Sequence, residues 1–273
     1  MLVQFPRSMS AKRIVCLTAE TTEFLYLLGE QERIVGISGF TVRPPQARRE
    51  KPRVAAFTSA KIDQIVALRP DLVLGFSDLQ ATIAADLVRA GIEIHIFNQR
   101  SLAQIIDFMR MLGAMVGAQR RTQTLIRGFE KGLHAAHSAA LRLPRRPRVY
   151  FEEWDQPMIC GIQWVSELIT LAGGEDCFAD LAICPNAQQR IIADPLEVVR
   201  RAPELIIGSW CGKKFRADRV HARSGWSTIP AVRNRQLHEI KSCDILAPGP
   251  AALGDGLRQL QVLIANCARM QSV

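Results

Sequence analysis

The segment Ile65–Phe76 has the sequence IVALRPDLVLGF, and a similar sequence, VVRRAPELIIGSW, occurs at Val198–Trp210. The two segments align without a gap, with Pro70 on Pro203. In each segment, apolar residues at helical spacing stop at the proline, and a short apolar run follows that is typical of a strand buried on both faces. The repeat therefore predicts the same helix and strand twice, in two halves of one chain.

A second pair of similar segments precedes the first pair. TEFLYLLGEQ begins at Thr22 and SELITLAGGE begins at Ser166, and each has a Glu six residues before a Gly that can end a helix in the left-handed conformation. The strand candidates RIVCLT, from Arg13, and RVYFEE, from Arg148, lie upstream. Both halves thus alternate strands with helices, which predicts parallel α/β layers.

Residues 118–144 contain no strand pattern, and leucines recur in them at helical spacing. We therefore expect an α/β fold of two Rossmann-like lobes joined by one long helix. The N-terminal lobe is expected over residues 1–117, the linker helix over 118–144 and the C-terminal lobe over 145–273. One continuous doubly wound sheet is the alternative. Two facing lobes would create a cleft, and clefts between domains are preferred ligand sites.

Composition and charge restrict the function further. No apolar run approaches the roughly 18 residues of a membrane span. The net charge is +9, but the basic residues form short clusters without interleaved aromatics, so nucleic-acid binding is not expected. Seven scattered cysteines without a Cys-x-x-Cys fit neither a disulfide framework nor a zinc site. The start of the sequence lacks a secretory pattern, which predicts a cytoplasmic protein, or a periplasmic one if a leader is missing.

The motifs of several enzyme classes are absent from the sequence. It has no G-x-G-x-x-G after the first strand candidate, no P-loop and no G-x-S-x-G. The carboxylates of FEEWD, Phe151–Asp155, form either an acid/base pair or a polar loop. His134 and His137 can share a helix face, but a third metal ligand is not obvious. No catalytic residue is therefore assigned.

Aromatic side chains follow several of the strand candidates. Ligands in parallel α/β sheets lie beyond the carboxyl ends of the strands, and aromatic rings at that edge suit a flat, largely apolar ligand. Packing against the core is the alternative, and it stays open for Phe57 and Trp226. The candidate ligand-binding aromatics are Phe40, Phe57, Phe76, Trp154, Trp164 and Trp210.

Several segments together resemble one known family. VGISGFTVRPPQA after LYLLGEQERI, the repeated IVALRPDLVLGF, AGGEDCF after a helix, and the ending IPAVRNRQLHEI resemble class III substrate-binding proteins of ABC importers, closest to the cobalamin-binding family. The resemblance implies two lobes on one rigid helix, no catalysis and no required cofactor. It implies that cobalamin or a related corrinoid is the ligand and is held in the cleft. A monomer with an ABC permease as partner is expected.

The resemblance also implies roles for individual residues. Phe40, Phe57 and Phe76 match aromatic positions that contact the corrin, and Trp154 lies near another. Two basic residues are candidate partners for propionamide, carboxylate or phosphate groups at the rim of the cleft, Arg43 and Lys213.

Permease docking is expected through one acidic residue on each lobe. Asp63 matches the first of these positions, whereas Leu196 stands at the second, and the neighbouring Glu197 is taken as the docking residue there. The sequence also lacks a secretory pattern and has a basic net charge, and neither feature is expected of a protein that docks on an ABC permease.

The segment SWCGKKF, Ser209–Phe215, is not part of the family's pattern. Its Cys211 has two lysines close by, so it is a candidate for a thiol of depressed pKa, or for a thiolate ligand to cobalt or iron. An ordinary loop cysteine is the alternative. Two other functions stay open for the whole chain: an iron-siderophore or haem-binding protein, and a cytosolic enzyme or ligand handler that depends on Cys211.

Overall fold

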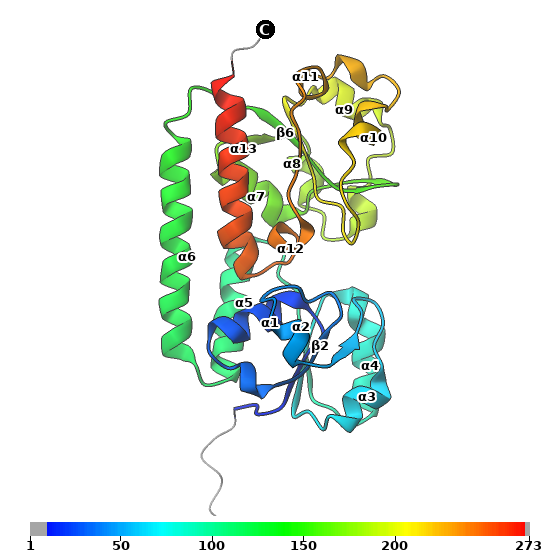
Figure 1. Ribbon diagram of the computed structural model, residues 1–273, viewed down its shortest axis with the longest axis vertical. Helices are drawn as coiled ribbons and strands as arrows, with labels where there is room; N and C mark the ends of the chain where they lie inside the picture. The colour runs from blue at the N-terminus through cyan, green and yellow to red at the C-terminus, as the bar shows by residue number, and fades with distance from the viewer. Residues whose placement is uncertain (1–9, 271–273) are drawn as a thin grey trace, which may run out of the picture. The chain divides into compact units, whose positions relative to one another are not determined.

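The computed structural model describes residues 10–270, which divide into two compact units. The first unit comprises the described residues up to Gln99 together with Ile105–Ile126, and the second comprises Arg100–Gln104 and the described residues from Arg127 onward. Helix α6, Gln119–Ala140, runs from the first unit into the second, within the range predicted for the linker (Figure 1). Within residues 10–270, no helix is both long and apolar enough to cross a membrane.

The first unit is a parallel sheet with helices on both faces. Its elements are β1 (Ile14–Cys16), α1 (Ala19–Leu27), β2 (Ile34–Ser38), α2 (Ala47–Glu50), β3 (Arg53–Ala55), α3 (Ile62–Ala67), β4 (Leu72–Phe76), α4 (Ala81–Arg89), β5 (Ile94–Phe97) and most of α5 (Leu102–Met115). The strand order is β3-β2-β1-β4-β5, and each neighbouring pair is parallel. Helices α3 and α4 cover one face, and α1 and α5 cover the other (Figure 1).

The second unit also contains a sheet covered by helices. Its elements after α6 are β6 (Arg148–Asp155), β7 (Met158–Cys160), α7 (Gln163–Leu171), β8 (Glu175–Asp176), α8 (Ala179–Ala182), α9 (Leu196–Arg201), β9 (Leu205–Gly208), α10 (Ala217–His221), α11 (Pro230–Arg233), β10 (Leu237–Glu239), α12 (Ser242–Ile245) and α13 (Leu257–Arg269). The strand order is β10-β9-β6-β7, with β8 beside β6.

One strand pair of the second unit is antiparallel, which the sequence did not predict. Strand β7 runs antiparallel to β6, whereas β8, β9 and β10 are parallel to their neighbours. Only Gln156 and Pro157 separate β6 from β7. A connection of two residues can reverse the chain into a hairpin but cannot make the crossover that a parallel pair needs.

The predicted repeat is confirmed as a structural repeat. The first copy forms α3 followed by β4, and the second forms α9 followed by β9. Between helix and strand, the residue before the proline is left-handed in both copies, with φ of 48° at Arg69 and 45° at Ala202. The residue before a proline is disfavoured in the α-helical region, so neither helix continues to the proline.

Glycine follows the first long helix of each unit, as predicted. Gly29 lies two residues after the end of α1 with φ of 71°, and Gly173 lies two residues after the end of α7 with φ of 95°. Both values lie in the left-handed region that glycine adopts without strain. A Cβ at Gly173 would also lie 2.6 Å from Leu143, so the close approach of the chain requires glycine there.

Each unit has its own apolar core. Phe24 of α1 contacts Phe108 of α5 in the first unit, with ring centroids 5.9 Å apart. In the second unit the ring of Phe215 packs directly on the backbone of Gly208, where a Cβ would come within 1.9 Å of the ring. The last glycine of the repeated strand therefore makes room for an aromatic core residue.

Candidate functional site

Two phenylalanines follow the carboxyl ends of two paired strands of the first sheet. Strands β2 and β3 pair Ser38 with Ala55, and the N–H of Gly39 donates to the carbonyl oxygen of Ala55 at 2.7 Å. Phe40 and Phe57 each follow this pair by two residues. Phe40 is 58% exposed and Phe57 is half-buried. This edge of the first sheet therefore presents aromatic surface to solvent, and the role of Phe40 and Phe57 in ligand binding stays a prediction.

Gln80, which the sequence did not indicate, fixes the main chain near the aromatic edge of the first unit. Gln80 is fully buried; its side-chain nitrogen donates to the carbonyl oxygen of Phe57 at 2.9 Å, and its oxygen accepts the N–H of Phe76 at 2.9 Å. Phe76 itself is only 6% exposed, so its ring belongs largely to the core, which corrects the ligand-facing expectation for this residue. Gln80 thus fixes the main chain of two predicted site residues with one side chain.

The predicted rim cation of the first unit is bound to a carboxylate of α1. Arg43 Nε lies 3.0 Å from Glu23 Oε1, and the arginine side chain is about one-third exposed. The pairing holds the guanidinium near the first helix while leaving part of it in solvent. Arg43 is consequently an oriented cation rather than a mobile one.

A second carboxyl group of α1 is buried. Glu20 is 4% exposed, and burial raises its pKa to about 7, because the charged form loses its hydration. A hydrogen bond with Thr18 opposes this shift, and the charge of Glu23 adds to it. Its Oε1 has no hydrogen-bond partner among the described residues. The sequence did not single out Glu20, since nothing in its immediate neighbours predicts burial.

The three carboxylates of FEEWD in strand β6 each have a basic partner. Buried Glu152 accepts from Arg223 at 2.6 and 2.9 Å, and Glu153 accepts from the buried Arg190 at 2.6 Å. Asp155 pairs with Lys213. Carboxylates held in separate ion pairs are structural, so the acid/base alternative is not supported by this arrangement.

The predicted rim cation of the second unit lies on an aromatic ring. Lys213 Nζ is 4.0 Å from the ring centroid of Trp154 and 5.1 Å from that of Trp210, while it pairs with Asp155. Trp154 is half-buried, and its indole N–H donates to the carbonyl oxygen of Gln156 at 2.8 Å. Trp154 and Lys213 therefore form one cluster at the end of β6.

The remaining tryptophans are core residues, which corrects the ligand-facing expectation for Trp164 and Trp210. Trp164 is 3% exposed and donates to the carbonyl oxygen of Ile245 at 2.9 Å. Trp210 is 2% exposed, packs on Phe215 and donates to Glu152 at 2.9 Å. Trp226 is fully buried. Packing and satisfied indole N–H groups account for the position of Trp164 and Trp210 without a ligand.

Cys211 does not have the environment of a reactive thiolate. The residue is exposed, yet the protein around the sulfur removes water from it, and this together with the charge of Glu153 raises the pKa of the thiol. A raised pKa is the opposite of the depressed one that was a hypothesis for Cys211, and it favours the alternative of an ordinary loop cysteine. Lys213 pairs with Asp155. Within residues 10–270, no cluster of three or more His, Cys, Asp or Glu side chains is placed to hold a metal.

The two predicted docking residues differ in their surroundings. Asp63 is exposed in the first turn of α3. Glu197 accepts from Arg201 at 2.8 Å and from Arg200 at 2.7 Å, and these hydrogen bonds lower its pKa. The charge of Glu197 is thus largely balanced within its own helix, α9.

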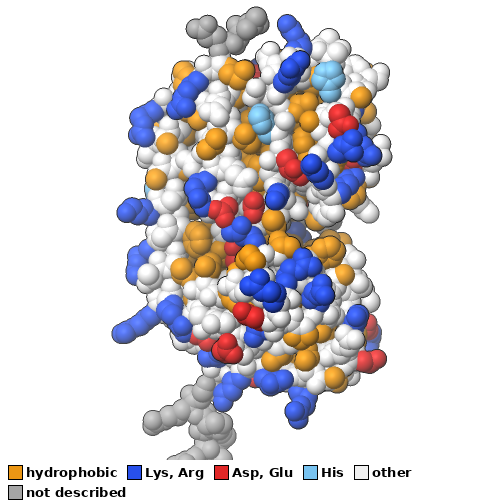
Figure 2. Space-filling view, viewed as in Figure 1, with side chains coloured by type: hydrophobic (Ala, Val, Ile, Leu, Met, Phe, Trp, Pro, Cys, Tyr) orange, Lys and Arg blue, Asp and Glu red, His pale blue; other side chains and the backbone are white. Residues whose placement is uncertain are grey.

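Lys and Arg side chains are dispersed over the face shown in Figure 2 and are interspersed with Asp and Glu.

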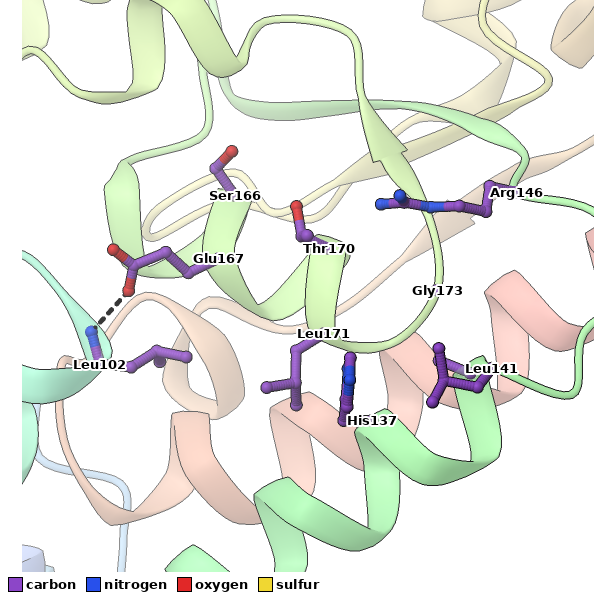
Figure 3. Close-up of a pocket in the computed structure, with 10 residues that line it drawn as sticks. Leu102, His137, Leu141, Arg146, Ser166, Glu167, Thr170, Leu171 and Gly173 are labelled. Carbon is purple, nitrogen blue, oxygen red and sulfur yellow. Dashed lines mark hydrogen bonds between the residues drawn. The ribbon is translucent and has the colours of Figure 1, made fainter.

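One pocket lies wholly within the second unit, between the end of α6 and α7 (Figure 3). Its volume is about 470 Å³, and its lining includes His137, Arg146, Glu167, Thr170 and Leu171. None of the predicted ligand-binding residues is among the residues that line it. The sequence indicated His137 only as a possible metal ligand, and gave no sign of this pocket.

Comparisons with known proteins agree with the fold. The chain is 26% identical to the vitamin B12-binding protein of Vibrio parahaemolyticus over 96% of its own length and 90% of that protein. The solved periplasmic vitamin B12-binding protein of Vibrio cholerae superposes with a TM-score of 0.76 at 23% identity, over 95% of this chain and 99% of that one. The periplasmic haem-binding protein of Roseiflexus superposes with a TM-score of 0.81 at 23% identity, over 95% and 100%.

A family model described as "Periplasmic binding protein" matches residues 14–243, which is most of the chain. The match spans both units and both copies of the repeat. The chain therefore belongs to the periplasmic binding protein family, whose members are the non-enzymatic, solute-binding components of ABC importers.

Proposed function

We propose that this protein binds a corrinoid, either cobalamin or a precursor of it, and delivers it to an ABC permease. The observation that carries the proposal is the aromatic edge of the first unit, where Phe40 is 58% exposed beside the half-buried Phe57. Each ring that a flat ligand covers fully contributes about 1.5–3 kcal/mol of apolar burial. Trp154 offers similar surface in the second unit. The ligand named for the Vibrio parahaemolyticus relative supports the same class.

Haem is the second candidate, and the basic side chains favour it. Arg43 and Lys213 are both partly exposed in the segments that follow β2 and β9, and the net charge is +9. Haem carries two propionate carboxylates, which form strong charge-assisted pairs with Arg and Lys, whereas the corrin periphery of cobalamin carries uncharged amides. The haem named for the Roseiflexus structure is in line with this candidate.

One titration series separates the candidates. The purified protein is titrated with cyanocobalamin, with hemin and with a ferric catecholate siderophore, and heat and visible absorption are recorded together. We expect saturable one-to-one binding of cyanocobalamin. Binding of hemin alone would replace the corrinoid with haem, and binding of the siderophore alone would replace both.

Two variants test whether the aromatic edge is the site. Phe40→Ala removes exposed aromatic surface from the edge, and Val262→Ala removes an apolar side chain that is 60% exposed on α13. Affinity for the bound tetrapyrrole should fall by about tenfold or more in the first variant and stay unchanged in the second. Equal affinities in both variants would place the ligand elsewhere.

The permease partner and the compartment belong to the same proposal. An ABC importer receives its ligand outside the cytoplasmic membrane, so we place the protein there, and Asp63 is a candidate contact because it is exposed on α3. Fractionation of the native host tests the location directly. Recovery of the protein only with cytoplasmic markers would favour a cytosolic ligand handler instead.

A further inference from the structure

The pocket between α6 and α7 has the volume of a small-molecule site. At about 470 Å³ it lies in the range typical of such sites, roughly 300–1,000 Å³. Apolar side chains form much of its wall, those of Leu102, Ala140, Leu141 and Leu171. A Cβ at Gly173 would lie 3.0 Å from the Cβ of Ala140, so glycine allows the chain after α7 to close one side of the pocket.

The carboxylate at one end of the pocket is already used by the protein. Glu167 Oε2 accepts the N–H of Leu102 at 2.7 Å, and its Oε1 accepts from Gln163 at 2.8 Å. Figure 3 shows this pair at one end of the pocket, away from Arg146. The negative charge of Glu167 is therefore held at the Leu102 end, where it serves the fold.

The opposite end of the pocket is positive. One nitrogen of Arg146, Nη2, donates to the carbonyl oxygen of Gly174 at 2.9 Å, which orients the guanidinium. Figure 3 shows the guanidinium directed toward Thr170, with the ring of His137 rising between Leu171 and Leu141. A guanidinium has five N–H donors, so this one bond leaves several for another acceptor. Arg146, Thr170 and His137 thus supply polar groups beside an apolar wall.

We propose that this pocket is a second ligand site, which binds a small amphipathic monocarboxylate. The carboxylate pairs with Arg146 and accepts from the hydroxyl of Thr170, and the apolar body lies against Leu141, Leu171 and Leu102. The positions of the charges suit such a ligand, because the Arg146 cation lies at one end of the pocket and Glu167, the only carboxylate among the described residues that line it, is hydrogen-bonded at the other. This second site is independent of the proposed tetrapyrrole site, since it shares no residue with the aromatic edge of the first unit or with the cluster of Trp154 and Lys213.

Octanoate is a suitable probe, with octanol as its uncharged match. We expect octanoate to bind saturably with a dissociation constant on the order of 1 mM or tighter. Arg146→Gln should weaken octanoate binding by about tenfold and leave octanol binding unchanged. Arg146→Lys keeps the charge and should lose only part of the affinity. Calorimetry and ligand-observed NMR give these values, and circular dichroism confirms that each variant is folded.

A matched control separates the site from general surface charge. Arg142 is exposed and close in sequence but does not line the pocket. Arg142→Gln removes the same charge and should leave octanoate binding unchanged. Equal weakening by both glutamine variants would overturn the proposal, as would octanol binding as tightly as octanoate. A lack of saturable octanoate binding to the parent protein at millimolar concentration would also overturn it.

Discussion

The carboxylate of Asp71 accepts the backbone N–H of Arg13 at 2.9 Å, next to the first residue of β1. The second unit repeats this contact, because Glu204 Oε2 accepts the backbone N–H of Arg148 at 3.0 Å where β6 begins. Asp71 and Glu204 are aligned residues of the repeated segment. The repeat therefore conserves a bond between two strands as well as a helix and a strand.

Removing this contact should destabilise the first unit. Asp71 also accepts the N–H of Lys12 at 2.8 Å, so Asp71→Ala loses two hydrogen bonds. The expected cost is about 1–2 kcal/mol, seen as a lower urea midpoint at unchanged slope. Asp86→Ala is the control, because Asp86 makes an exposed ion pair with Arg89 and should cost less than about 0.5 kcal/mol. Equal midpoints in the two variants would contradict the role of Asp71.

Local sequence was sufficient for the elements of the repeat and for their glycine caps. The spacing of apolar residues and the positions of proline and glycine determine local structure over a few residues. These signals predicted α3, β4, α9 and β9. The exposed Phe40 was found in the same way, because it lies two residues after a strand.

Contacts between distant segments were beyond the reach of the sequence. Trp210 was expected to end a repeated strand, but β9 ends at Gly208 and the repeat aligns Phe76 with Ser209, one residue before Trp210. Side chains alternate faces along a strand, so an offset of one residue changes the face. The hypothesis of a reactive thiol at Cys211 is not supported for a related reason. Lys213, which is close to Cys211 in sequence, pairs with Asp155 of β6. The sequence did not indicate Gln80, since its contact with Phe57 joins segments 23 residues apart.

The buried carboxyl of Glu20 should make stability depend on pH. Its pKa is about 7 in the folded protein against 4.5 for an ordinary glutamate, so the folded state binds the proton more tightly. Stability is therefore greatest below about pH 4.5 for this group and falls as pH rises toward and through 7. Glu20→Gln should match the parent near pH 5 and exceed it by about 1–3 kcal/mol at pH 8.5.

Urea unfolding at pH 5, 7 and 8.5 measures this effect. Glu32→Gln serves as the control, because Glu32 is exposed and its substitution should leave the pH dependence of the parent intact. A Glu20→Gln protein with the same pH dependence as the parent would show that Glu20 is not the group responsible.

Replacing Gln80 should disturb the aromatic edge without touching a ring. Gln80→Leu keeps the approximate volume but removes the hydrogen bonds that Gln80 makes with the N–H of Phe76 and the carbonyl oxygen of Phe57. The expected loss of stability is about 1–3 kcal/mol. Affinity for the tetrapyrrole should also fall, because the chain at Phe57 loses a fixed point. Gln64→Leu, on the exposed side of α3, is the matched control and should change neither quantity.

Phe40 and Trp210 should respond in opposite ways to truncation. Trp210→Ala removes a core side chain that is 2% exposed and leaves the buried Glu152 without one donor, so it should cost about 3–5 kcal/mol. Phe40→Ala removes a ring that is 58% exposed, so stability should change by less than about 0.5 kcal/mol while tetrapyrrole affinity falls about tenfold or more. Melting temperature and affinity are measured on both variants, with affinity expressed per folded protein. A Trp210→Ala protein that melts like the parent but binds weakly would return Trp210 to the ligand site, and a Phe40→Ala protein with parental affinity would remove Phe40 from it.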